Sequence, residues 1–125
     1  MAGRESLWSR HPDYRVDLEP RAGRVRAVFG GTTVAASERA LLVCETRHEP
    51  VVYFPREDVR LEHLERTDHG TFCPFKGEAS YWTLCDGGAR AENAAWSYED
   101  PFPEVAGLRG YVAFYPDRVR LEEEG

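Results

Sequence analysis

The segment from Thr71 to Trp82 concentrates the side chains of this chain that are best suited to chemistry. It contains a thiol, Cys73, and an amine, Lys76, three residues apart among several aromatic rings. Lys76 is the only lysine in the chain, although the sequence has sixteen basic residues in all. Lysine carries a compact charge and loses its proton when it is desolvated, whereas arginine does not. Lys76 is therefore a candidate catalytic residue, and the alternative is a lysine in a solvated turn.

Cys73 is the second candidate catalytic residue. It follows His69 by four residues and precedes Lys76 by three. A nearby cation lowers the pKa of a thiol and makes the nucleophilic thiolate available. The competing interpretation is structural, because a Cys-Pro pair suits the turn between two strands.

Carboxylates that could pair with Lys76 lie in two places in the sequence. Glu57 and Asp58 follow Pro55, and we expect them to contribute to a ligand-binding site. Together with Glu78, they are the expected partners of the Lys76 ammonium. Arg39 and Glu45 come from one apolar segment interrupted by polar residues and could both face inward. A charge there must be paired, so we expect a network of arginine and carboxylate groups.

The aromatic residues predict a pocket as well as a core. Successive residues of a strand point to opposite faces, so Tyr81 and Trp82 must serve different sides of the sheet. Asn93 lies in a predicted strand, where asparagine is disfavoured, so it either forms a bulge or bonds a ligand. The expected ligand-binding walls are Tyr53, Tyr81, Asn93, Trp96 and Tyr98.

Composition excludes several classes of function. A net charge of −6 argues against sequence-independent nucleic-acid binding, which needs a basic surface. No apolar run approaches the roughly 18 residues of a membrane span, and the first residues do not resemble a secretory signal. Three cysteines without a C-x-x-C pair predict reduced thiols in the cytoplasm, with no metal and no cofactor. Cys44 and Cys85 are expected to be small buried hydrophobic residues that do not react.

The pattern of apolar residues predicts a single, mainly antiparallel β domain. An extended N-terminal arm over residues 1–20, anchored by Trp8 and Tyr14, precedes a β domain over residues 21–125. Glycine pairs mark hairpin turns at residues 30–31 and 87–88. Helical turns are expected at 56–59 and 104–108, and an ordinary turn at 67–70. The expected strands cover residues 24–29, 32–36, 41–44, 51–54, 79–85, 89–98, 110–115 and 118–122, with a helix as the alternative for 41–44.

Several segments resemble the bacterial and fungal family called DUF427, in the family's order and over nearly the whole chain. The segments that carry this resemblance are 11–16, 53–59, 73–77, 93–98 and 110–115. The resemblance implies a β-tent fold, similar to Mss4-like domains, and some classifications label the family a nucleotidyltransferase. That activity normally needs two metal ions held by clustered acids. The sequence has neither an Asp-x-Asp pair nor a P-loop, so it argues against nucleotidyl transfer.

The sequence therefore predicts a protein with a polar and aromatic pocket for a small molecule that carries an anionic or carbonyl group. Whether the protein is an enzyme is left open. The alternatives are a non-catalytic interaction module, including a homodimer, and an oxidoreductase that depends on Cys73.

Overall fold

The computed structural model describes residues 5–124 and confirms a mainly β architecture. All named strands pair antiparallel and form three sheets. The finer expectation, an arrangement like that of Mss4, stays a prediction.

Each sheet is built mostly from neighbouring segments of the chain. The first has the order β1-β4-β5, with β1 at Val16–Pro20, β4 at Leu41–Glu45 and β5 at Val51–Tyr53. The second has the order β10-β2-β3, with β10 at Arg120–Glu124, β2 at Arg24–Phe29 and β3 at Thr32–Ser37. The third has the order β6-β7-β8-β9, with β6 at Leu64–Cys73, β7 at Gly77–Asp86, β8 at Ala89–Ser97 and β9 at Val112–Phe114. Short 3₁₀ helices lie at Trp8–Arg10 (η1), Arg56–Asp58 (η2), Leu61–His63 (η3) and Pro103–Leu108 (η4).

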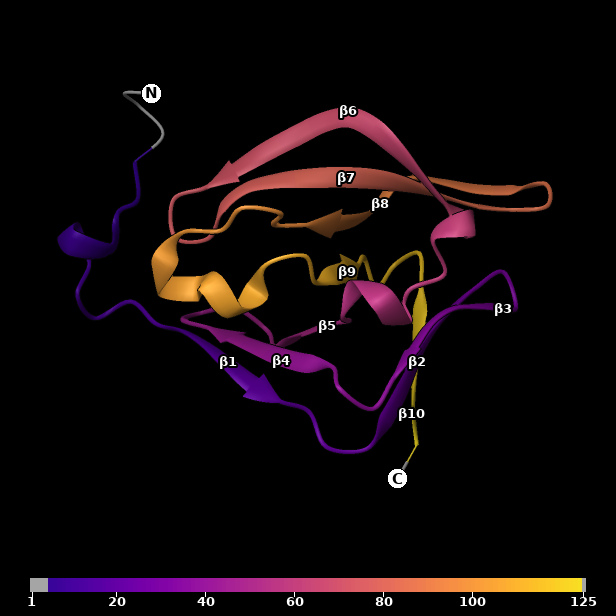
Figure 1. Cartoon of the computed structure of the whole chain (residues 1–125), viewed down its shortest axis with the longest axis horizontal. Coiled ribbons are helices and arrows are strands. Elements are labelled where there is room, and N and C mark those ends of the chain that lie inside the picture. Colours follow the sequence, from indigo (N-terminus) through magenta and orange to yellow (C-terminus); the bar gives the residue numbers. More distant parts are fainter. Residues whose placement is uncertain (1–4, 125) are drawn as a thin grey trace.

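The sheets enclose the space between them (Figure 1). Strands β6 and β7 lie on one side, β1 and β4 lie on the other, and β2 and β10 cross at one end. Helix η1 of the N-terminal arm lies at the opposite end, beyond η4. A two-way backbone bridge between Phe54 and Val112, with both hydrogen bonds at 2.8 Å, joins the end of β5 to β9. The first and third sheets are thereby held together along one seam.

Both glycine hairpins form as expected. Gly30 and Gly31 have φ of 60° and 84° and connect β2 to β3. Two positive φ values are the pattern of a type I′ turn, whose twist matches that of the strands. Gly87, with φ of 59°, begins the two-residue connection from β7 to β8. The preference for a strand over a helix at 41–44 is also confirmed.

Two expectations about local structure are wrong. The turn expected at 67–70 lies inside β6, where the register with β7 shifts between Arg66 and Gly70. β6 pairs with β7 both before and after these polar residues. They therefore form a bulge within one strand and not a turn between two strands. The strand expected at 110–115 is shorter, since β9 contains only Val112–Phe114.

The alternation along β7 divides the interior into two clusters. Trp82 and Leu84 belong to the larger cluster, together with Val25, Phe54 and Phe114. The opposite face of β7 contributes Ala79 and Tyr81 to a smaller cluster, whose other buried members are Val43, Tyr53, Tyr98, Leu108 and Ala113. The smaller cluster contains three tyrosines, so this part of the interior carries polar hydroxyl groups.

The N-terminal arm holds the turn that carries Lys76. Trp8 Nε1 donates a hydrogen bond of 2.8 Å to the Phe75 carbonyl oxygen, and Tyr14 stacks on the Phe75 ring with centroids 3.8 Å apart. The expectation that Trp8 and Tyr14 anchor the arm is therefore confirmed. The last part of the arm, Val16–Pro20, is strand β1 and pairs with β4.

We predict that Gly77→Ala destabilises the fold, because Gly77 has φ of 115° and every L side chain is strained there. The expected loss in the free energy of unfolding is about 1–3 kcal/mol. Gly88→Ala is the matched control, since a Cβ at Gly88 meets no atom within 4 Å. Urea unfolding measures both variants, and equal losses would contradict the role given to Gly77.

Candidate functional site

The backbone fixes the position of Lys76 on both sides. Lys76 lies in the turn between β6 and β7, and its amide donates to the Cys73 carbonyl oxygen at 3.2 Å. Its own carbonyl oxygen accepts a hydrogen bond of 3.1 Å from the Phe102 amide, in the segment that precedes η4. The following residue, Gly77, has the positive φ that sends the chain into β7. These constraints direct the Lys76 side chain inward.

The Lys76 ammonium forms an ion pair with Glu45, at the end of β4. Both side chains are largely buried, with 10% and 12% of their surface exposed. Tyr14 donates a hydrogen bond to the second oxygen of the same carboxylate. The prediction that Lys76 pairs with Glu57, Asp58 or Glu78 is therefore wrong, because Glu45 supplies the carboxylate from the first sheet.

The pKa of Glu45 reflects this arrangement. Burial alone raises the pKa of a carboxyl group, but hydrogen bonds from Lys76 and Tyr14 and the charge of Lys76 outweigh it and lower the pKa of Glu45. Glu45 is thus ionised at neutral pH and holds the ammonium of Lys76 beside it.

A pocket of about 370 Å³ opens beside this ion pair. Four tyrosines and a tryptophan are among its lining residues. Tyr53, Tyr81 and Trp96 lie in β5, β7 and β8, whereas Tyr98 and Tyr115 lie just beyond the ends of β8 and β9. The lining residues are Val43, Glu45, His48, Glu49, Val51, Tyr53, Lys76, Tyr81, Trp96, Tyr98 and Tyr115.

The rings are fixed relative to one another. Trp96 Nε1 donates a hydrogen bond of 3.0 Å to the Tyr53 hydroxyl oxygen, and the two rings meet at 88°. Tyr115 packs on the other side of Trp96, with centroids 4.5 Å apart. The Lys76 ammonium lies 5.8 Å from the centroid of the Tyr98 ring, within the range of a cation–π contact. The pocket therefore combines apolar ring faces with one buried positive charge.

Several tyrosine hydroxyls of the pocket stay protonated and can therefore donate hydrogen bonds. Burial raises the pKa of Tyr98 and of Tyr53 above the ordinary value for tyrosine. Burial, with a hydrogen bond to Tyr81, raises the pKa of Tyr115 to about 12. These groups stay protonated at neutral pH, so each offers a proton to an acceptor atom.

The structure brings together five of the residues named from the sequence and places the others elsewhere. Tyr53, Lys76, Tyr81, Trp96 and Tyr98 line the pocket. Cys73 does not line it but packs against the same cluster, half-buried.

The other three residues named from the sequence have separate roles. Asn93 has a φ of 51° at a register shift of β8 and accepts a hydrogen bond of 2.7 Å from Thr67, so the bulge interpretation holds. Glu57 and Asp58 lie at η2. Arg39 contacts both, and Ser37 donates to Asp58 at 2.6 Å.

Sequence reasoning left Tyr14, Glu45, His48, Glu49 and Tyr115 out of the site, together with the apolar lining residues Val43 and Val51. The strand-terminal position of Glu45 was a usable signal, because an ionised side chain at the end of an apolar run needs a partner. Tyr14 was expected only as an anchor, yet its hydroxyl bonds Glu45. No local signal identifies His48 and Tyr115, which reach the pocket because separate sheets meet there.

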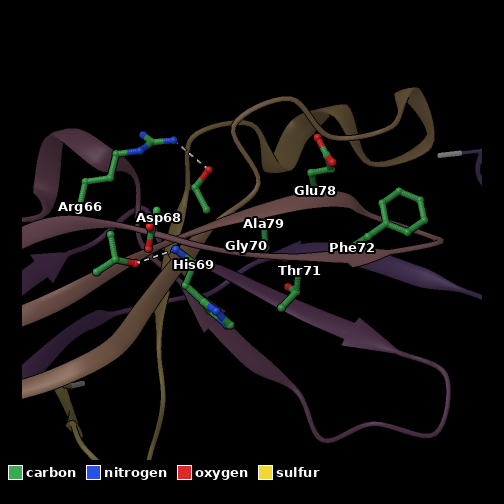
Figure 2. Close-up of a pocket in the computed structure, with 10 residues that line it drawn as sticks. Arg66, Asp68, His69, Gly70, Thr71, Phe72, Glu78 and Ala79 are labelled. Atoms are coloured by element: carbon green, nitrogen blue, oxygen red, sulfur yellow. Dashed lines mark hydrogen bonds between the residues drawn. The ribbon is translucent and has the colours of Figure 1, made fainter. Parts of the chain in front are cut away.

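A larger hollow, of about 720 Å³, follows the edge of the third sheet along β6 and β7. Figure 2 shows that its side chains diverge: Arg66 and Glu78 lie on one side of the ribbon, while His69 and Thr71 point to the other. Arg66 is engaged with Ser80 at 3.0 Å and with Glu99 at 2.9 Å. This hollow lacks a convergent set of polar groups, whereas the pocket beside Lys76 has one.

The cysteines are free and partly exposed. The expectation that Cys44 and Cys85 are buried is wrong, because both are only partly buried near the ends of β4 and β7. Partial burial, with Glu19 and Asp17 nearby, raises the pKa of the Cys44 thiol.

Within residues 5–124, no group of three or more His, Cys, Asp or Glu side chains is placed to hold a metal ion. In the same part of the chain, no helix has the length and apolar character needed to cross a membrane.

Comparison with known proteins shows the family. The model of the family described as a domain of unknown function, DUF427, matches residues 17–125. Because this match covers most of the chain, the protein belongs to that family. No curated protein matches the chain. The matched range contains the whole pocket but not Tyr14, which completes the ion-pair network from the arm.

We predict that Glu45→Gln lowers the free energy of unfolding at pH 7 by about 3 kcal/mol, because it leaves the buried charge of Lys76 without its partner. Glu65→Gln is the control, since the pair of Glu65 with Arg90 is exposed and contributes at most about 1 kcal/mol. Urea unfolding at pH 7 compares the three proteins.

The pH dependence of the same proteins gives a second test. The pKa of Glu45 is lowered in the fold, so its contribution is present above the unfolded-state pKa of about 4.3 and disappears as the pH falls through the folded-state value. The difference between the wild type and Glu45→Gln should therefore shrink below about pH 4. A difference that stays constant from pH 7 to pH 3 would contradict the assignment of Glu45 as the ionised partner.

Proposed function

We propose that the protein binds a small molecule in the pocket beside Lys76, and that the ligand presents a carbonyl or carboxylate oxygen to this residue. The observation that carries the proposal is the buried ammonium of Lys76 at the wall of an aromatic pocket. An ammonium group is a donor only, and protonated tyrosine hydroxyls also donate, so the polar groups suit an acceptor oxygen. The ring faces suit a flat apolar body.

The charges near the pocket favour a carbonyl group over a free anion. Glu45 already neutralises Lys76, and Glu49 adds a second negative charge to the lining. A carboxylate ligand meets both acids, whereas a carbonyl oxygen accepts hydrogen bonds without a net charge. Like-charge juxtaposition disfavours the anion, although direct contact with Lys76 compensates in part.

Two other interpretations stay predictions. An interaction module or homodimer requires a contiguous apolar surface, and the large exposed apolar residues of the described chain are Leu61, Tyr115 and Leu121. Only Tyr115 of these lies at the pocket. An oxidoreductase that depends on Cys73 requires a substrate within reach of that thiol, which packs beside the pocket and not in its lining.

Three probes of matched size distinguish the ligand classes: benzamide, benzoate and benzylamine. Their binding is measured from the ¹H–¹⁵N signal of the Trp96 indole, whose N–H lies at the pocket wall. We expect benzamide to bind, benzoate to bind less tightly and benzylamine not to bind. Binding of benzylamine alone, or of none of the three, would overturn the proposal.

Lys76→Arg tests the residue that carries the proposal. The arginine keeps the positive charge beside Glu45, but its larger, planar guanidinium group changes the positions of the hydrogen-bond donors and fills part of the pocket. We expect benzamide affinity to fall by about tenfold or more, the cost of one hydrogen bond to a charged group. Arg90→Lys, on the exposed surface of β8, is the control and should leave the affinity unchanged. Equal affinity in wild type and Lys76→Arg would exclude Lys76 from the binding site.

A further inference from the structure

We propose that Lys76 forms a covalent imine with the carbonyl carbon of a small aldehyde or ketone bound in the pocket. This inference rests on the proposed function and extends it from binding to a reaction class. In this reaction the Lys76 nitrogen is the nucleophile and Glu45 accepts the proton. The pocket tyrosines donate hydrogen bonds to the carbonyl oxygen.

Lys76 is placed to act as an amine nucleophile once its ammonium has given a proton to Glu45. The residue is 8% exposed, and its nitrogen lies against the Glu45 carboxylate and the Tyr98 ring. Lysine forms imines with carbonyl substrates, and a carboxylate in hydrogen-bond contact can take the proton that must leave the ammonium first. A pocket of about 370 Å³ next to this nitrogen holds a carbonyl compound the size of a single aromatic ring.

The reaction balances with the groups that are present. The Lys76 ammonium gives one proton to Glu45, and the free amine adds to the carbonyl carbon. A carbon–nitrogen bond forms while the carbonyl electron pair moves to oxygen. That oxygen receives a proton that leaves the nitrogen, either directly or through a tyrosine hydroxyl that donates one proton and regains another. Glu45 then returns its proton to the hydroxyl group, which departs as water and leaves a protonated imine on Lys76.

The ion pair that is present before the reaction is restored when the imine has formed. The ammonium and the protonated imine carry the same charge, and Glu45 is a carboxylate at the start and at the end. The site therefore does not have to bury an unpaired charge, which costs several kcal/mol. Tyr14, which donates to the other oxygen of Glu45, keeps the carboxylate oriented at both stages.

The single lysine makes the test direct, because the only other amine of the chain is its N-terminus. The protein is incubated with benzaldehyde and sodium cyanoborohydride, which reduces the imine to a stable N-benzyl secondary amine on the lysine. Intact-mass analysis and peptide mapping then locate the benzyl group. We expect one benzyl group on Lys76, formed about tenfold or more faster than on free Nα-acetyl-lysine, as proximity to a bound aldehyde requires.

Two controls separate this inference from the proposed function. Lys76→Arg retains the charge but has no reactive amine, so it should show no benzyl group in the peptide that contains residue 76. Urea-unfolded wild type should react at the rate of Nα-acetyl-lysine.

Each remaining outcome is decisive. Benzamide binding without a benzyl group on Lys76, or labelling no faster than that of Nα-acetyl-lysine, overturns the imine and leaves the binding proposal standing. Failure of both benzamide binding and labelling overturns the two together.

Discussion

The ion pair between Glu45 and Lys76 is the constraint on which the site depends. A buried charge is tolerated only when a partner is held against it, and here the partner comes from a different sheet. The end of β4 and the turn between β6 and β7 must therefore keep their relative positions across the interior. The N-terminal arm supports both sides of this contact, because Tyr14 bonds Glu45 and stacks on Phe75, the neighbour of Lys76.

The pocket is a consequence of that same junction. The seam between Phe54 and Val112 ties the first sheet to the third, and the tyrosines of the smaller cluster face the space beside it. Burial keeps these hydroxyls protonated, while Glu45 keeps Lys76 charged and paired. The result is a donor-rich, aromatic site, and this is the basis of our proposal that it binds a carbonyl group in preference to a free anion.

Much of the fold could be predicted from the sequence because its signals are local. Glycine pairs predicted both hairpins, and alternation placed Tyr81 and Trp82 on opposite faces of their strand. Lys76 stood out as the single lysine. Its partner could not be predicted, because Glu45 reaches it only through the packing of two sheets. Glu57 and Asp58 were wrongly chosen as partners because the local sequence shows where carboxylates occur. It does not show which of them meets Lys76 across the interior.

The most direct test of the account is the ¹H–¹⁵N signal of the Lys76 ammonium in protein labelled at lysine, where one lysine gives one signal. A buried ammonium bonded to a carboxylate exchanges its protons slowly enough with water to be observed, whereas an exposed one does not. The account predicts an observable signal at neutral pH that is lost in Glu45→Gln and shifts when benzamide is added. A signal that is absent in the wild type, or that ignores benzamide while the Trp96 indole responds, would contradict it.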